Sequence, residues 1–500
     1  MEEIVQALFE QGALLRNGSI KLAKSLSSIQ IPSTVQAVLA SRIDRLPAQA
    51  KELLQTLAVI GKEFAFRLVR EVSGKADDEV QRLLSELQIA EFIYEQPAVS
   101  DVAYQTVRLL EGALEKVGTD DSPLRARALG GLARYLGVTG ERQQLMLYAT
   151  QAVAMARRLG DPELIAYSLL GVFYALTEPE HCEQRLAIAT ELLDLAKAAN
   201  ATTQIAVGQF WRGYCLLELG DMAAADAELD AWGRWGEETN QPFYYSMSAV
   251  LRAMRALMQG RFQDSERLVQ QAFAVGQRLQ METSAGIFGL QMFALRREQG
   301  RLKELEAAVR FFVQQQTVAA TWRPGLALIY SELGQVSEAS ELFETLALHD
   351  FADLPRDSLW MGTMTYLVDV CTFLGDRVRA HTLYQILLPF GGRNVVVSHG
   401  VACYGALSRY LGALATTLER WDEAEQHFED ALAMNARMEA YPWLARAQHQ
   451  YARMLLDRPG DRDRAVSLLE AALATARELG MNTLEELATI DISQVTEKLH

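Results

Sequence analysis

The sequence predicts an all-α protein, built as a solenoid of about nine stacked helix pairs with a small separate domain before it. Turn-forming residues recur about every 40 residues, and each lies between two stretches with helical periodicity. The turn positions are Gly140, Glu180, Gly220, Gly260, Gly300, Gly334, Gly375, Arg420 and Gly460. One helix pair cannot bury its own apolar face, so neighbouring pairs must stack.

Composition and charge agree with a helical protein that does not bind nucleic acid. Half of the 500 residues are hydrophobic, and only 12 prolines are available to break helices. The net charge of −16 argues against nucleic acid as the main partner, because phosphate neutralisation needs clustered Lys and Arg. No secretion signal or long apolar run is visible, so we expect a cytoplasmic protein with no membrane contact.

Two short regions precede the array. Residues 1–30 look like the end of a larger domain, with a helix predicted over Glu2–Leu15 and a strand within 19–22. Residues 31–102 begin with a helix after Pro32, and Pro47 opens a second helix. A further helix over about 77–88 and a strand over 91–94 complete the pattern, and several short helices followed by a strand indicate a winged-helix-like domain.

The array itself covers residues 103–490 and is followed by a tail, 491–500. Turn glycines supply positive φ, and the aspartate that follows caps the second helix in Gly220-Asp221, Gly375-Asp376 and Gly460-Asp461. A small residue five positions after the turn lets the paired helices approach, and a bulky residue four positions later fills the interface. The small residues are Ala225, Ser265, Ala339, Ala380 and Ala465, and the bulky ones are Leu229, Val269, Phe343, Tyr384 and Leu469.

This small-then-large pattern after a Gly-Asp turn resembles the tetratricopeptide repeat, over about residues 120–480. The spacing is longer than the usual ~34 residues, which is similar to the sensor regions of large bacterial ATP-dependent regulators. The resemblance implies a right-handed superhelix in which the first helix of each pair lines a concave groove.

Residues 31–47, IPSTVQAVLASRIDRLP, carry a second resemblance. They are similar to the segment after the nucleotide-binding domain of the signal transduction ATPases with numerous domains, such as adenylate-cyclase-fused and maltose-activator-like regulators. Residues 58–64 and 91–95 continue the resemblance, and Met1–Val5 resembles the closing helix of that ATPase domain. The resemblance implies a signal-transduction role in which the array acts on an ATPase domain in cis or in trans.

The chemistry of an ATPase is not visible in this sequence. No GxxxxGK[ST] motif occurs, and Gly61-Lys62 is followed by Glu63, so we expect a regulator without its ATPase core or output domain, and no cofactor. No HExxH, GxSxG or CxxC motif occurs either, so no catalytic residue and no metal site are predicted. We expect the four cysteines to be buried reduced thiols. They are Cys182, Cys215, Cys371 and Cys403.

Candidate binding residues lie on the predicted first helices. The arginines are Arg212, Arg252, Arg255, Arg296, Arg297 and Arg323, and the aromatic residues are Trp211, Tyr244, Trp322 and Trp360. A basic strip inside a groove would suit a protein or acidic peptide partner, or a small anionic effector. The alternative is that the aromatic residues pack in the core and the arginines pair with second-helix carboxylates such as Glu228, Glu266 and Glu304.

An irregular stretch over 389–400 lengthens the unit before Arg420. It predicts either an extended connector or a ligand or partner loop against the concave face, with Arg393 and His399 as polar contacts. The sequence as a whole predicts a non-enzymatic sensor or scaffold. The alternative is a nucleic-acid-binding regulator that uses the winged-helix-like region, although residues 31–100 hold eight Lys and Arg against ten Asp and Glu.

Overall fold

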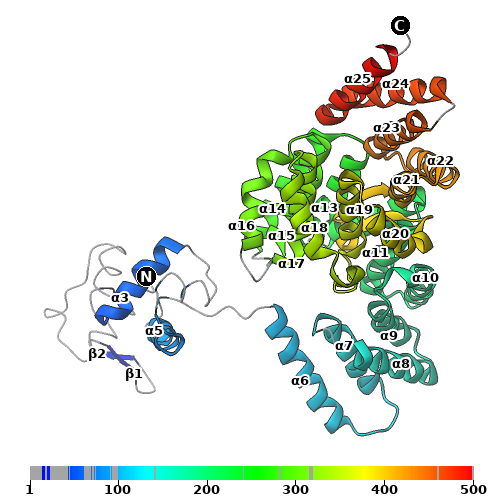
Figure 1. The fold of residues 1–500 in the computed structure, drawn as a ribbon. Coiled ribbons are helices and arrows are strands. Elements are labelled where there is room, and N and C mark those ends of the chain that lie inside the picture. The colour runs from blue at the N-terminus through cyan, green and yellow to red at the C-terminus, as the bar shows by residue number, and fades with distance from the viewer. Residues whose placement is uncertain are drawn as a thin grey trace. The chain divides into compact units, whose positions relative to one another are not determined.

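The computed structural model describes residues 99–497 apart from 140–141, 240, 280, 282, 315–318 and 459–460. Before residue 99 it describes residues 14–16, 20–22, 43, 46–60, 69, 73, 75–89 and 92. The chain divides into two compact units, Met1–Ala98 and Val99–His500 (Figure 1).

The first unit begins with a small hairpin. β1 (Leu14–Arg16) pairs antiparallel with β2 (Ile20–Leu22), which confirms the strand predicted within 19–22. The helix predicted over Glu2–Leu15 is wrong at its end, because its last two residues belong to β1 and form part of the antiparallel pairing.

Two helices of the first unit share a small apolar core. α3 (Ala48–Ile60) and α5 (Asp77–Ile89) match the helices predicted after Pro47 and over 77–88. The buried core residues are Ala50, Leu53, Leu57, Val69, Val80, Leu83 and Leu87. The helix predicted after Pro32 and the strand over 91–94 lie largely outside the described residues, so the winged-helix-like arrangement stays a prediction.

The second unit is an all-α solenoid with the expected number of helix pairs. α6 (Val99–Val117) precedes nine consecutive pairs, and α25 (Asn482–Glu497) follows them. The pairs are α7 (Pro123–Thr139) with α8 (Arg142–Leu159), α9 (Pro162–Ala175) with α10 (Cys182–Ala198), α11 (Thr202–Glu218) with α12 (Met222–Glu238), α13 (Pro242–Met258) with α14 (Phe262–Arg278), α15 (Ser284–Glu298) with α16 (Glu306–Gln314), α17 (Ala319–Glu332) with α18 (Val336–Leu346), α19 (Trp360–Leu374) with α20 (Arg377–Leu387), α21 (Leu407–Thr417) with α22 (Trp421–Arg437), and α23 (Tyr441–Asp457) with α24 (Arg462–Leu479). Every predicted turn position that the structure describes lies between the two helices of one pair.

The turns have the predicted chemistry. Left-handed glycines, with φ between 67° and 74°, stand at Gly220, Gly260, Gly300, Gly334 and Gly375. The side chains of Asp221, Asp376 and Asp461 each accept a hydrogen bond from the backbone amide three residues later, and so cap the second helix. All five small residues predicted after the turns are buried, which allows the close approach of the paired helices.

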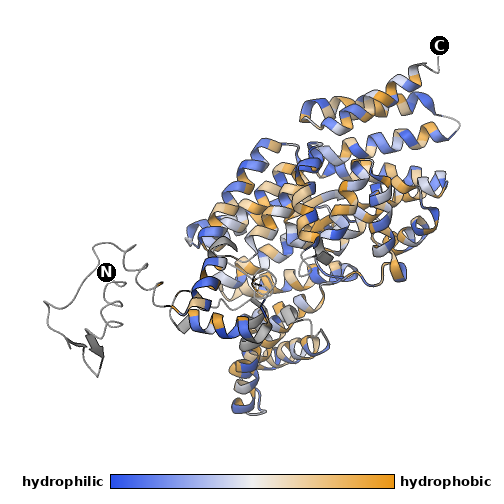
Figure 2. Cartoon of the chain, turned by 60° about the vertical axis from the view of Figure 1, so that its left-hand side comes forward, coloured by the Kyte–Doolittle hydropathy of each residue, from blue (hydrophilic) through white to orange (hydrophobic). Residues whose placement is uncertain are grey.

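The array turns back on itself. A Cβ added to Gly260 would lie 2.6 Å from the side chain of Leu479, at the end of α24. A Cβ added to Gly300 would lie 2.8 Å from the backbone nitrogen of Thr483 in α25. The last helices therefore pack on the turns of units that lie near the middle of the chain. Figure 2 shows hydrophilic and hydrophobic residues along the same helices, the amphipathic pattern that lets one face be buried.

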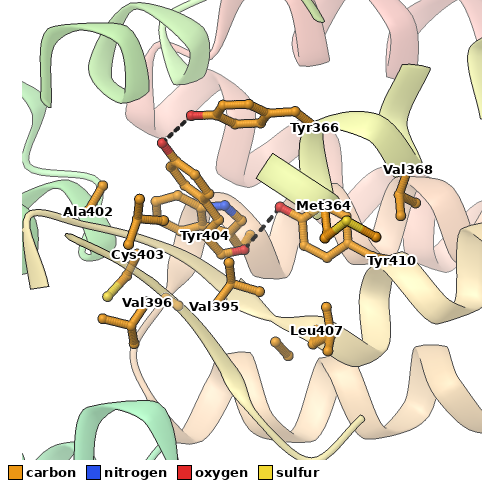
Figure 3. Close-up of a cluster of buried hydrophobic side chains, with 14 of the residues drawn as sticks. Met364, Tyr366, Val368, Val395, Val396, Ala402, Cys403, Tyr404, Leu407 and Tyr410 are labelled. Atoms are coloured by element: carbon orange, nitrogen blue, oxygen red, sulfur yellow. Dashed lines mark hydrogen bonds between the residues drawn. The ribbon is translucent and has the colours of Figure 1, made fainter. Parts of the chain in front are cut away.

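A β-hairpin is inserted between α20 and α21, within the stretch predicted to be a connector or a binding loop. β3 (Asn394–Val397) pairs antiparallel with β4 (Ala402–Ala406), with Val396 opposite Cys403, and every residue of both strands is buried. We call residues 394–406 the inner hairpin. Figure 3 shows its side chains packed among those of α19 and α21. The sequence did not predict this sheet, because its second strand, ACYGA, has no alternating pattern.

Candidate functional site

The inner hairpin lies on the side of the array that the first helices line. It contacts six first helices, α11, α13, α15, α19, α21 and α23, and one second helix, α22. The side-chain amide of Asn394 donates to the carbonyl oxygen of Leu217 at 3.0 Å. Gln291 donates from one amide nitrogen to the carbonyl oxygens of Val250 and Val401, at 2.8 and 3.0 Å. The groove expected between these helices is therefore filled in large part by the chain itself.

Both residues predicted as contacts in this stretch meet earlier units of the same chain. The ring of His399 packs edge-on against Trp211 and Tyr214 of α11, with centroids 5.3 and 5.6 Å away. Burial, together with the charge of Arg185, lowers the pKa of His399 to about 4. Arg393 donates to Glu183 at 2.5 Å, and this hydrogen bond lowers the pKa of that carboxyl.

Two of the six groove arginines pair with the carboxylates named in the alternative interpretation. Arg212 binds Glu228 of the second helix in its own unit. Arg296 binds Glu266 of α14 at 2.5 Å and approaches Glu304 at 3.5 Å. The assignment of these arginines to a ligand stays a prediction, but their charges are neutralised within the protein.

Arg252 and Arg255 lie on α13 and line an open polar depression of about 570 Å³ between α12 and α14. Arg252 binds Glu237 at 3.0 Å. Arg255 binds Asp226 at 3.1 Å and reaches the C-terminal units, where it donates to the carbonyl oxygen of Met438 and to Glu439, both at 2.8 Å. Another of the six predicted groove arginines, Arg323, is exposed on α17.

Arg297 belongs to a buried charge network that joins the first helices of five units. Its guanidinium binds Glu332 of α17 at 2.7 Å and Asp369 of α19 at 2.5 Å. Arg409 of α21 lies 3.6 Å from Asp369 and donates to Gln450 of α23 at 2.9 Å. Burial raises the pKa of Asp369, but the two arginines outweigh burial and hold it below its usual value.

A second link closes this network. Arg446 of α23 binds the buried Glu298 of α15 at 2.7 Å. Three arginines thus face three carboxylates inside the array, which is the balance that makes buried charges tolerable. Because α15 and α23 are joined directly, the first helices form a closed ring and not an open arc.

The predicted aromatic residues divide between core and cavity. Trp211 packs against Phe173 with a centroid distance of 4.7 Å, and Tyr244 lies 4.8 Å from Trp235. Trp360 is buried under Arg356, whose guanidinium carbon lies 4.3 Å from the ring centroid. Trp211 and Trp360 are therefore core side chains and Tyr244 is partly buried against the core, whereas Trp322, also partly buried, lines a cavity.

That cavity has a volume of about 270 Å³ and lies between three consecutive first helices, α15, α17 and α19, and the inner hairpin. We call it the first-helix cavity. Its lining residues are Thr283, Gly286, Ile287, Leu290, Phe293, Trp322, Gly325, Leu359, Gly362, Thr363, Tyr366, Val397 and Ser398. A concave apolar site with a few polar groups is where small ligands usually bind.

Of the predicted binding residues, only Trp322 is among those that line the cavity. One signal could have found more: Gly286, Gly325 and Gly362 recur once per unit on successive first helices, where glycine is otherwise unfavourable. The wall supplied by Val397 and Ser398 could not have been found, because it depends on the hairpin folding back.

The remaining chemistry is limited in the part of the chain that the structure describes. All four cysteines are buried and unpaired, as predicted, and burial raises the pKa of Cys371 and Cys403 to about 12. Within the described ranges, no cluster of His, Cys, Asp and Glu is placed to hold a metal ion. Nor is any described helix long and apolar enough to cross a bilayer.

Comparison with known proteins supports the repeat assignment. The family described as tetratricopeptide repeat matches residues 404–478, which places such repeats in α21–α24. Tetratricopeptide repeats generally mediate protein–protein interactions. A search of curated proteins found no match.

Two solved structures are similar to the chain. One is a signal transduction ATPase with numerous domains from Pyrococcus horikoshii that has a tetratricopeptide repeat sensor, with 12% identity over 92% of this chain and 68% of that chain and a TM-score of 0.24. The other is a circular tandem repeat protein with a novel repeat topology and enhanced subunit contact surfaces, with 14% identity over 92% of this chain and 98% of that chain and a TM-score of 0.12.

Proposed function

We propose that the array is a non-enzymatic sensor module that binds a small effector in the first-helix cavity. The observation that carries this proposal is a partly open cavity of about 270 Å³ between three first helices and the inner hairpin. Residues from four separate elements converge there, so a ligand would touch all of them at once. Binding would therefore favour the closed arrangement of these elements over any other.

The inner hairpin favours a small effector over a long peptide on the first helices. Both strands are buried, and the hairpin contacts six first helices. A peptide that ran along these helices would have to displace the hairpin and leave its buried backbone without partners. A protein partner, which tetratricopeptide repeats generally bind, would instead use the outer surface of the array.

In this proposal the module regulates a separate activity. Residues 31–47 resemble the segment that follows the nucleotide-binding domain in signalling ATPases, so the regulated domain would be such an ATPase, in cis or in trans. The closed ring provides the physical link, because the cavity-lining helices α15 and α19 also carry Arg297 and Asp369 of the buried charge network. A ligand in the cavity could thus shift the arrangement of the first helices in all five units of the network.

A thermal-shift screen of metabolite classes would test the proposal. A true effector at 100 times its Kd should add about 2.7 kcal/mol to the free energy of unfolding. Trp322→Ala should abolish the shift, whereas Trp421→Ala, at a partly buried tryptophan on α22, should leave it intact. If no compound gives a shift that depends on Trp322, the cavity does not bind an effector.

A further inference from the structure

The lining of the first-helix cavity defines the chemistry of what it can hold. Among its described lining residues, none carries a charge. An ionised group held against this lining would lose hydration without gaining an opposite charge. The lining therefore disfavours carboxylates, phosphates and ammonium groups, in contrast to the anionic effector that the arginines suggested in the sequence.

Three aromatic rings form one wall of the cavity. The centroid of Phe293 lies 5.4 Å from that of Tyr366 and 6.3 Å from that of Trp322, and neither pair is stacked face to face. Trp322 is in turn stacked on Phe312 of α16 with a centroid distance of 6.0 Å. Rings in this arrangement offer both faces and edges, and a flat guest ring makes offset or edge contacts with them.

Four hydroxyl groups supply the polar contacts, from Thr283, Thr363, Tyr366 and Ser398. The Tyr366 hydroxyl is hydrogen-bonded to the hydroxyl of Tyr404 inside the inner hairpin, which fixes its position. A hydroxyl can donate or accept one hydrogen bond without a net charge. The matching groups on a ligand are a neutral hydroxyl, carbonyl or ring N–H.

Glycines set the size of the cavity. A Cβ added to Gly286 would meet no atom within 4 Å, and one added to Gly325 would lie 3.5 Å from the Phe293 ring. Gly286 therefore faces open space, whereas Gly325 leaves room for a Cβ in ordinary contact with the aromatic wall. The volume of about 270 Å³ exceeds the ~150 Å³ of an engineered cavity that holds benzene, so it has room for about two fused rings.

From these observations, and resting on the proposal that the cavity binds an effector, we propose that its ligand is a small uncharged molecule with a flat apolar body of about two rings and one or two neutral hydrogen-bonding groups. The apolar walls hold the body, and the hydroxyls select its polar edge. Charge is the feature that the site rejects.

Three probes of one size class test the assignment. 1-Naphthol has the predicted chemistry, naphthalene-1-sulfonate has the same rings with a charge, and glucose is neutral but polar all round. Binding is measured on the full chain by titration of tryptophan fluorescence and by calorimetry. We expect saturable binding of 1-naphthol, and an affinity at least about tenfold weaker for the sulfonate and for glucose.

Gly325→Leu should fill part of the cavity, since leucine favours helix over glycine and the added Cβ has ordinary contacts. It should weaken 1-naphthol binding at least about tenfold. Gly112→Leu on α6 is the control, because a Cβ there, as at Gly286, meets no atom within 4 Å, and its binding should be unchanged. Gly286→Leu repeats the test if Gly325→Leu does not fold.

The outcomes separate the ligand class from the proposed function. If the sulfonate or glucose binds more tightly than 1-naphthol and loses affinity in Gly325→Leu, the cavity is the binding site but the ligand class is wrong. If 1-naphthol does not bind, or binds both Gly325→Leu and Gly286→Leu as tightly as the parent protein, the ligand class proposed for this cavity is wrong. If the metabolite screen also gives no thermal shift that depends on Trp322, the proposed function is wrong as well.

Discussion

The helices α6–α8 and the helices from α11 to α25 consist of the same paired unit but are held together differently. Ion pairs of the first region join α7 and α8 to the next helix pair, α9 and α10: Arg127 with Glu163 and Arg157 with Glu191, 36 and 34 residues apart. In the second region, which we call the closed body, they also join residues much farther apart in the chain. Arg446 binds Glu298 across 148 residues, and Arg255 binds Glu439 across 184.

The difference shows that a repeat array need not stay quasi-linear. When each unit touches only its neighbours, stability is close to a sum of local terms and the ends can unfold separately. Contacts between distant units tie the closed body into one structure, so it should unfold as a single cooperative transition. We therefore expect α6–α8 to exchange amide hydrogens before the closed body does.

The largest expected effect comes from the buried charge network. Asp369→Ala removes the shared partner of Arg297 and Arg409, so that Arg297 keeps only Glu332 and the buried Arg409 loses its carboxylate. We expect a loss of about 3–5 kcal/mol in the free energy of unfolding, measured by urea denaturation. A loss of less than about 1 kcal/mol, the size seen for exposed pairs, would show that the network does not hold the ring closed.

The next effect is a pH dependence that comes from His399. Its pKa is about 4 in the folded protein and ~6.5 when unfolded, so the unfolded state binds more protons between these values. Stability should fall by about 3 kcal/mol as the pH drops from 6.5 to 4. His399→Asn suits the left-handed backbone at this position, where φ is 58°, and removes the titration. Equal pH slopes for the variant and the parent protein would refute this assignment.

Alanine substitutions at two turn glycines allow a direct comparison of the two regions. Gly160, after α8, and Gly300, after α15, have φ of 70° and 72°, so alanine should cost each about 1–2 kcal/mol through backbone strain. Only at Gly300 would the new Cβ also meet the backbone of α25. We expect Gly300→Ala to cost about 1–3 kcal/mol more than Gly160→Ala. It should also speed proteolysis within α24–α25, and equal effects at both sites would mean that α25 is not docked there.

The smallest effect is expected for an exposed neighbour pair. The side chains of Arg157 and Glu191 are 55% and 44% exposed, although they lie 2.7 Å apart. Arg157→Ala should change the free energy of unfolding by less than about 1 kcal/mol, and that change should shrink in high salt. A larger, salt-independent loss would indicate that α8 is held as tightly as the closed body.

Much of the fold could be predicted because it depends on local chemistry. Asp221 and Asp376 cap helices within three residues of themselves, and Ala225 and Ala380 are small where their own pair must approach. The candidate site was harder to predict. The carboxylates that pair with Arg212 and Arg296 were among those the sequence named as possible partners, whereas Arg297 meets Asp369 two units away, a contact that no local pattern encodes.

The sequence by itself determined the helix pairs, their number and their turns, because glycine, aspartate and small residues act on the backbone within a few positions of themselves. Only the tertiary structure decided that the ring closes, that residues 394–406 fold inward as a hairpin and that a cavity remains beside Trp322. The physical reason is that these features depend on small angles between successive units. Those angles accumulate over five pairs before α15 meets α23 and Glu298 meets Arg446.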